Sequence, residues 1–208
     1  MRPKWANMPY ADFTLERVEL DFGLTTRLAE LFPNLAPLPV PEPLAYWLAR
    51  GRQTAAIVSE KARSEFIVAP ILLITQDQTS NALSIYSGQR LDVDPARGLV
   101  GECDFILALV PPVPRLKAPL LTVLEAKRGD IELGLGQCAA QMVAARLFNE
   151  RAGEGNRSIF GCVTTGEVWQ FLRLEGDLIL LDPQRLYLDN LGGILAVLRA
   201  IIIQGELG

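Results

Sequence analysis

The sequence ECDFILALV occupies residues 102–110, and LLTVLEAK occupies residues 120–127, with a proline-rich loop between them. Both runs are almost wholly apolar, which is typical of strands that are covered on both faces of a sheet. We therefore expect strands at 99–110 and 120–127. Three charged residues, Asp104, Glu125 and Lys127, lie within these runs. A charge in an apolar strand is costly unless it is paired or lies at a strand end, so these residues are candidates for function.

The rest of the chain alternates helical and strand patterns. The spacing of apolar and turn-forming residues predicts helices at 25–32, 44–50, 59–70, 131–150 and 190–204, and strands at 82–86, 158–164, 168–174 and 178–181. Ser59 is the expected N-cap of the third helix, and Pro70 is expected to end or bend it. Together these elements predict an α/β fold with a mixed central sheet flanked by helices.

Three local patterns add further predictions. Five prolines between Pro33 and Pro43 indicate an extended connector. Residues 1–43 are therefore expected to form an N-terminal extension, and residues 44–208 the main domain. Tyr46 and Trp47 are the expected apolar anchors of the helix at 44–50. The stretch 87–89 (SGQ) is expected to form a turn after the strand at 82–86.

The amino-acid composition excludes several classes of catalytic and metal site. The chain has no histidine, which excludes Ser-His-Asp and Cys-His catalysis and metal sites that need imidazole. Its 24 acidic and 20 basic residues give a net charge of −4, unlike the strongly basic surface of an autonomous DNA-binding protein. Three dispersed cysteines predict reduced, buried thiols in a cytosolic setting. Charges interrupt the first residues, and the apolar run 194–203 is too short to span a membrane, so we expect a cytoplasmic protein without membrane binding.

The placement of the three charged residues suggests a metal site. Side chains alternate along a strand, so Glu125 and Lys127 project on one side. If the two strands pair as a hairpin, Asp104 can face Glu125 across the ladder. Two close carboxylates repel each other, and a divalent cation relieves that repulsion better than Lys127 alone. Mg²⁺ favours carboxylate, water and phosphate oxygens, so this set suits hydrolysis, with Lys127 orienting or deprotonating the attacking water.

The triplets ECD at 102–104 and EAK at 125–127 resemble the signature of the PD-(D/E)XK nuclease superfamily, the restriction-endonuclease-like proteins. Cys103 replaces the proline of that signature. The resemblance covers about residues 59–165 and matches Glu60 to the helical glutamate that often joins the metal site of this family. Gln137 is similar to the glutamine of the Q-x-x-x-Y element in RecB-type members, where Gln141 stands in place of the aromatic residue.

This resemblance implies a restriction-endonuclease-like sheet and a Mg²⁺-dependent endonuclease, with Mn²⁺ as a substitute, that hydrolyses phosphodiester bonds in nucleic acid. DNA is the expected substrate. The implied metal ligands are Asp104, Glu125 and Glu60, and the implied catalytic residues are Asp104, Glu125, Lys127 and Gln137. Many enzymes of this fold act as dimers, so a homodimer is an alternative to a monomer.

Plainer interpretations remain open at this point. The charged triad could be an ion pair at a strand edge, and Glu60 could only favour a helix N-terminus, with Glu65 as its rival for a ligand role. Gln137 and Gln141 could be surface residues on one helical face. Arg128 could contact phosphate or be a solvated charge. The whole chain could be a non-catalytic nuclease-fold protein that serves as a binding or regulatory subunit, or a structural protein with a coincidental motif.

Overall fold

The structure is a computed structural model that describes residues 9–54, 57–77, 83–127, 129–155 and 157–207. Within these residues one mixed sheet forms the centre of the molecule, with strand order β1-β7-β6-β5-β4-β3-β2 and β8 paired to β6. Its strands are β1 (Thr25–Leu28), β2 (Ser84–Arg90), β3 (Glu102–Ala108), β4 (Leu120–Ala126), β5 (Ile159–Thr164), β6 (Val168–Glu175), β7 (Leu178–Leu181) and β8 (Leu186–Tyr187).

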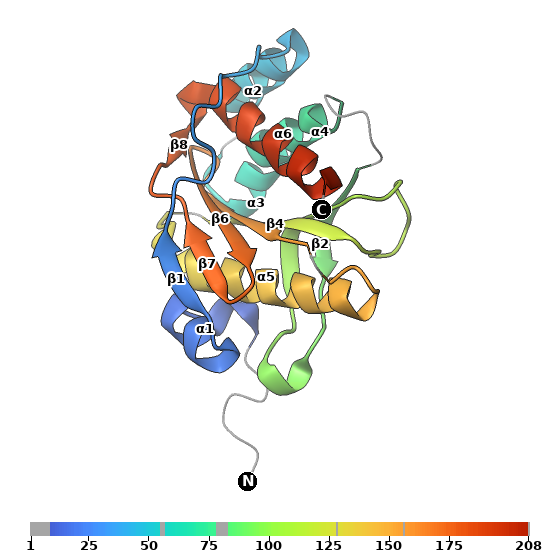
Figure 1. Cartoon of the computed structure of the whole chain (residues 1–208). Coiled ribbons are helices and arrows are strands. Elements are labelled where there is room, and N and C mark those ends of the chain that lie inside the picture. The colour runs from blue at the N-terminus through green and yellow to red at the C-terminus, as the bar shows by residue number, and fades with distance from the viewer. Residues whose placement is uncertain (1–8, 55–56, 78–82, 128, 156, 208) are drawn as a thin grey trace.

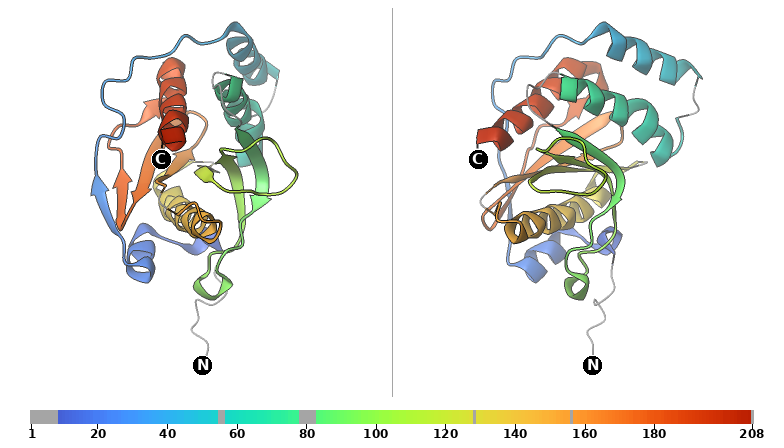
Figure 2. Two further views of the ribbon diagram at one scale, coloured as in Figure 1. Left: turned by 45° about the vertical axis from the view of Figure 1, so that its right-hand side comes forward. Right: turned by 90° about the vertical axis from the view of Figure 1, so that its right-hand side faces the viewer.

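Helices cover both faces of this sheet. The helices are α1 (Leu15–Phe22), α2 (Glu42–Thr54), α3 (Glu60–Arg63), α4 (Ala69–Asp77), α5 (Glu132–Arg151) and α6 (Leu191–Leu207), with a π-helical segment η2 (Ser64–Val68) between α3 and α4 and 3₁₀ turns η1 (Tyr10–Asp12), η3 (Pro95–Arg97) and η4 (Leu188–Asn190). Helices α1 and α5 pack on one face, and α2, α4 and α6 pack on the other (Figure 1; Figure 2). The predicted α/β fold with a mixed sheet between helices is confirmed.

The middle of the sheet consists of the β3–β4 hairpin and the crossover through α5 to β5. Strand β4 is buried at every position, between antiparallel β3 and parallel β5. Helix α5 lies close to its neighbours because small residues face them: a Cβ atom at Gly136 would lie 2.3 Å from the carbonyl oxygen of Phe13. This close packing fixes the first turns of α5 relative to the sheet.

The described part of the expected N-terminal extension joins the same core. Thr25–Leu28 forms the edge strand β1, which pairs in parallel with β7, so the helix expected at 25–32 is wrong. Two successive β-branched threonines favour a strand once a neighbouring edge is available. Tyr10 and Val18 are buried in the α5 side of the core. The boundary at residue 43 stays a prediction, but residues on both sides of it share one sheet.

The predicted helix end at Pro70 is also wrong, and the alternative, a bend there, stays a prediction. The helical backbone runs from Glu60 to Asp77, and Pro70 lies in the first turn of α4. The π-helical segment precedes it, with the N–H of Ala69 bonded to the carbonyl oxygen of Ser64, five residues back. A π turn changes the register of the backbone bonds, which accommodates a residue without an N–H. Ser59 caps the segment as expected, since its Oγ accepts from Ala62 N at 3.1 Å.

Two further local predictions need correction. Strand β2 does not turn at 87–89 but continues to Arg90, because Gln89 and Arg90 still pair with β3. Gly88 within it adopts a φ of 62° that other residues rarely reach. The first residue of the strand expected at 82–86 lies outside the described residues. Tyr46 and Trp47 do not anchor α2, since they are 58% and 62% exposed, and Leu44 and Leu48 are buried instead.

The cysteines and the last helix bear on the cellular setting. Cys103, Cys138 and Cys162 are free and buried, which confirms the expected thiols. The segment Leu188–Leu207 is long and apolar enough to cross a membrane by length and composition, but most of it is buried against the rest of the chain. That burial is typical of a core helix in a soluble protein.

Candidate metal centre

Asp104 and Glu125 meet at the open end of the β3–β4 hairpin. The paired register ends with Phe105 opposite Leu124, and one further step would place Asp104 opposite Glu125. At this point Oδ2 of Asp104 accepts a hydrogen bond of 2.7 Å from the backbone N–H of Ala126. A side-chain carboxylate thus takes the place of a backbone acceptor between the strands, and the expected encounter of the two acids occurs where the ladder ends.

Glu125 is buried, and both of its carboxylate oxygens are bonded. Its side chain is 6% exposed. Oε1 accepts from Nζ of Lys127 at 2.9 Å, and Oε2 accepts from Nε2 of Gln141 at 2.9 Å. Nζ of Lys127 also donates to Oε1 of Gln137 at 2.7 Å. The ion pair at the strand end therefore exists, but it belongs to a buried network and not to a solvated edge.

Helix α5 supplies both glutamines of this network. Gln137 and Gln141 lie one helical turn apart and are 8% and 0% exposed, so the interpretation of both as surface residues is wrong. The helix reaches the end of β4 because residue 134 is glycine: a Cβ there would lie 3.1 Å from Cγ of Lys127. The backbone N–H of Lys127 donates to the carbonyl oxygen of Thr164 at 2.7 Å. Lys127 is thereby held by its backbone and by its side chain.

The two carboxylates are electrostatically strained. Burial raises the pKa of Glu125 to about 7, repulsion from Asp104 adds to the rise, and Lys127 opposes it. Burial also raises the pKa of Asp104, against the opposing hydrogen bond from Ala126 and the charge of Lys127, while Glu60 adds to the rise. Both shifts disfavour the charged carboxylates, mainly because the groups are buried, and a bound cation would favour the charged form.

A hollow of about 360 Å³ opens beside Asp104. Its lining residues are polar or glycine: Glu60, Lys61, Ser64, Glu65, Ser87, Gly88, Glu102 and Asp104. The four carboxylates of this lining outnumber its one lysine, which is paired with Glu65 at 3.5 Å. Glu60 and its rival Glu65 therefore both lie at the hollow, and Glu60 also acts electrostatically on Asp104.

The donor chemistry of this site fits a hard divalent cation. Asp104, Glu125 and Glu60 offer carboxylate oxygens, and Mg²⁺ binds through one or two carboxylates while it keeps several waters. Within the described ranges, no three Asp, Glu, Cys or His side chains converge closely enough to form a ready cage. Binding would therefore use few protein ligands and several waters.

The predicted site residues are thus brought together to different degrees. Glu125, Lys127 and Gln137 are joined by hydrogen bonds, Asp104 is bonded to the backbone of Ala126 between the first two, and Glu60 lies at the hollow beside Asp104. The bond from Gln141 to Glu125 was missed, although the four-residue spacing from Gln137 signals a shared helical face. Arg128 lies outside the described residues.

Two comparisons with known proteins identified no relative. No protein-family model matches the chain, and a search of curated proteins found no match. The resemblance to PD-(D/E)XK nucleases therefore stays a prediction.

Proposed function

We propose that this protein is a cytoplasmic nuclease that uses Mg²⁺ or Mn²⁺ to hydrolyse phosphodiester bonds in nucleic acid, with DNA as its substrate. The observation that carries the proposal is the junction of Asp104 and Glu125 at the open end of the hairpin, beside the fixed ammonium of Lys127. When bound there, the cation would act as a Lewis acid that stabilises charge on the phosphate and lowers the pKa of the attacking water.

Each residue of the network has a role that follows from its contacts. Asp104 and Glu125 hold the cation. Lys127 keeps its ammonium at a fixed point with two of its three N–H groups engaged by Glu125 and Gln137, so the third can bond to water or to a phosphate oxygen. Its side chain is 19% exposed, which leaves it access to solvent. Gln141, on α5, keeps Glu125 oriented by donating a hydrogen bond to its Oε2 atom.

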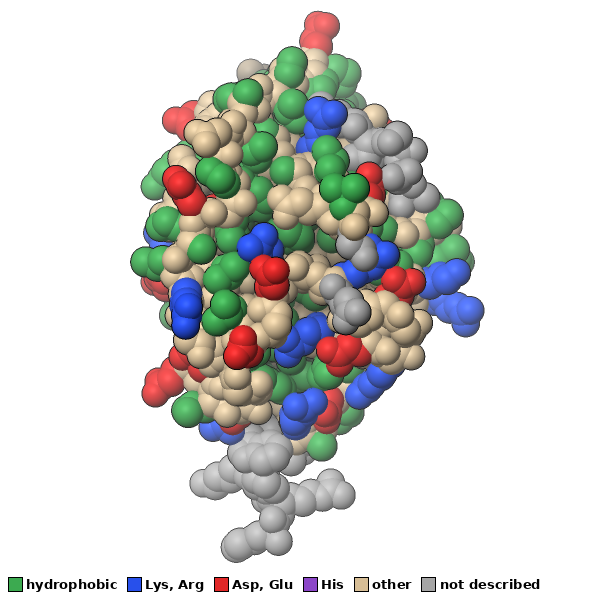
Figure 3. Space-filling model, viewed as in Figure 1, with side chains coloured by type: hydrophobic (Ala, Val, Ile, Leu, Met, Phe, Trp, Pro, Cys, Tyr) green, Lys and Arg blue, Asp and Glu red, His purple; other side chains and the backbone are tan. Residues whose placement is uncertain are grey.

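The mixed charges of the protein favour a few local phosphate contacts over tight general binding of nucleic acid. Over the face shown in Figure 3, acidic and basic side chains are interspersed. The hollow beside Asp104 is acidic, so it repels phosphate unless a cation is present. Affinity for nucleic acid should therefore depend on the divalent cation and should have a shallow dependence on monovalent salt.

A non-catalytic binding or regulatory protein with this fold is the second candidate. Two observations favour it: the excess of acidic residues, and the hydrogen bonds that already engage both oxygens of Glu125. The two candidates differ in what they expect of the cation, because only the nuclease needs it to be bound by Asp104.

Nicking of supercoiled plasmid DNA in Mg²⁺ and in Mn²⁺ tests the proposal. The wild type should nick in either cation and not in EDTA. Lys127→Met and Asp104→Asn should each lower the rate by at least about a hundredfold, the usual worth of a proton-transfer or charge-stabilising group. Nicking that persists unchanged in both variants would disprove the roles of Asp104 and Lys127 and, with them, the proposed nuclease site. Cation binding without nicking would favour the second candidate.

A further inference from the structure

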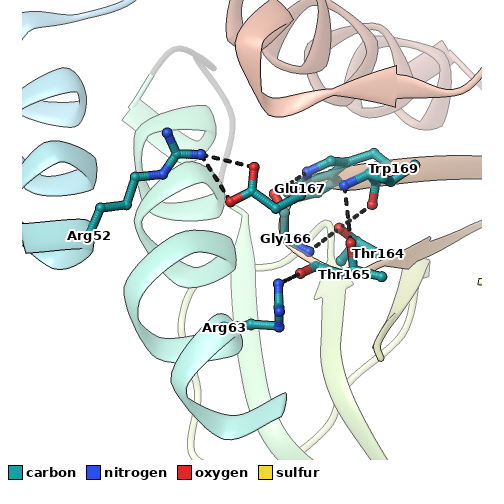
Figure 4. A network of polar contacts seen from close by, with 8 residues as sticks. Arg52, Arg63, Thr164, Thr165, Gly166, Glu167 and Trp169 are labelled. Carbon is teal, nitrogen blue, oxygen red and sulfur yellow. Dashed lines mark hydrogen bonds and ion pairs between the residues drawn. The ribbon is translucent and has the colours of Figure 1, made fainter. Parts of the chain in front are cut away.

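The turn between β5 and β6 is rigid and lies next to the candidate site. Thr165 N donates to the carbonyl oxygen of Val168 at 3.0 Å, and Gly166 N donates to Oγ1 of Thr164 at 2.9 Å. Nε1 of the buried Trp169 donates to the carbonyl oxygen of Gly166 at 3.1 Å (Figure 4). Thr164 is also the residue whose carbonyl oxygen accepts the backbone N–H of Lys127. The turn therefore fixes one side of the catalytic lysine.

The helical segment that contains Arg63 and Ile67 packs against this turn. Gly166 has a φ of 81°, and a Cβ there would lie 3.1 Å from Cδ1 of Ile67. Arg63 lies four residues before Ile67, and its Nη1 donates to the carbonyl oxygen of Thr165 at 2.8 Å (Figure 4). One apolar and one polar contact thus hold the turn against the same helical segment.

Arg63 is placed for this bond and not for an ion pair. Its Nε atom is buried and has no hydrogen-bond partner in the described part of the chain. No carboxylate among the described residues lies within ion-pair distance of it, whereas Arg52 reaches both oxygens of Glu167 on the same turn at 2.9 and 3.0 Å. The buried Nε carries a desolvation cost, and the hydrogen bond from Nη1 to the Thr165 carbonyl is a polar contact that offsets it.

Arg63 also belongs to α3, the helix that begins at Glu60. Two hydrogen bonds to adjacent residues of the turn therefore connect this helix to the catalytic lysine. Arg63 donates to the carbonyl oxygen of Thr165, and the N–H of Lys127 donates to the carbonyl oxygen of Thr164. We propose that Arg63 is a positioning residue, which fixes the distance between the Glu60 helix and the Lys127 side of the site. This inference rests on the proposed nuclease function.

Substitution at Arg63 tests the proposal, with Arg52 as the matched control. Arg63→Met keeps most of the aliphatic stem and removes the donor. Arg52→Met removes an ion pair whose partners are both about half exposed, 51% and 50%, on the outer side of the same turn, where little effect is expected. Both variants are compared with the wild type in circular dichroism and thermal melts, and all activity measurements are made well below the lowest melting temperature.

Three readouts separate positioning from mere stability. Arg63→Met should lower kcat for plasmid nicking about tenfold or more, with a smaller change in KM, and should weaken Mn²⁺ binding several-fold in a calorimetric titration. It should also speed the amide hydrogen exchange of Thr165 and Lys127 beyond the change in global stability. Arg63→Lys, which keeps a cationic donor, should recover a large part of kcat. Arg52→Met should stay within about twofold of the wild type.

The outcomes that overturn the proposal are distinct from those that overturn the nuclease function. A wild type without metal-dependent nicking removes the function itself. A wild type that nicks, with a folded Arg63→Met that matches it in kcat and Mn²⁺ affinity, overturns only the positioning role. Equal losses in Arg63→Met and Arg52→Met do so too. If Arg63→Met does not fold, Arg63→Gln, whose shorter amide cannot reach Thr165, is judged by the same criteria.

Discussion

The metal-free protein should lose stability as the pH rises, and Glu125→Gln should remove the part of that loss that comes from Glu125. The pKa of Glu125 is about 7 in the folded protein, against 4.5 for an ordinary glutamate. A carboxyl whose pKa is raised by folding contributes stability that is fully present below about pH 4.5 and is lost as the pH rises through about 7. At roughly 1.4 kcal/mol for each pKa unit, the whole loss amounts to about 3 kcal/mol.

Glutamine is a suitable replacement because the network can accept it. Nζ of Lys127 can still donate to the amide oxygen at position 125. The Oε1 atom of Gln141 is buried and has no hydrogen-bond partner within the described residues, so after an amide flip it can accept from the new N–H₂ group. The variant therefore keeps the packing of the site and loses the titrating carboxyl.

The assay is urea unfolding in EDTA between about pH 4.5 and pH 8. The stability of the wild type, measured relative to Glu125→Gln, should fall by about 3 kcal/mol over this range, or about 6–12 °C in melting temperature for a chain of this size. The comparison cancels groups that titrate equally in both proteins. A difference that does not change with pH would refute the raised pKa. A wild type that gains relative stability with rising pH would show that the ion pair with Lys127 outweighs burial.

Three substitutions test other parts of the structure. Gln141→Leu removes the N–H group that donates to Oε2 of Glu125, which should raise the pKa of that carboxyl further. Mn²⁺ affinity near pH 7 should therefore fall about tenfold in a calorimetric titration. An unchanged affinity would count against the hydrogen-bond network. Gly136→Ala places a Cβ 2.3 Å from a backbone oxygen of the segment before α1 and should lower the free energy of unfolding in denaturant by about 2 kcal/mol or more. Gly129→Ala, whose Cβ would meet nothing within 4 Å, should lower it by less than about 0.5 kcal/mol. Similar losses in the two variants would contradict the close packing of α5. Asn149→Leu removes two hydrogen bonds of 2.8 and 2.7 Å to the backbone of β4 and should cost about 2–4 kcal/mol, so a loss below about 1 kcal/mol would disprove the role of this side chain.

The sequence alone was sufficient for the middle of the fold. The continuous apolar runs that became β3 and β4 are seven residues long and lie on either side of a proline-rich loop, which favours short buried strands over helices. Helix α5 followed from its length and from the apolar residues along it. The three charged residues stood out for the same reason, since charges inside apolar strands are rare without a partner. The fold class was therefore predictable from local pattern, and the same pattern marked the residues of the candidate site.

Features that depend on distant partners were not predictable. Strand β1 has only four residues, and its stability comes from pairing with β7, about 150 residues later in the chain. Pro70 reads as a helix breaker until the π-helical segment before it is known. The bond from Arg63 to the Thr165 carbonyl leaves no mark in the sequence, because an arginine on a short helix has many possible acceptors. In each case a tertiary contact overrides the local preference.

A calorimetric titration of the metal-free protein with Mn²⁺ tests the central claim most directly. It compares the wild type with Asp104→Asn, and with Asp189→Asn as a control at an exposed aspartate outside the site. The wild type should bind a single Mn²⁺ per chain, Asp104→Asn should bind it at least about tenfold more weakly, and the control should match the wild type. No binding by the wild type at millimolar Mn²⁺, or equal affinity in Asp104→Asn, would contradict a cation site at the open end of the β3–β4 hairpin.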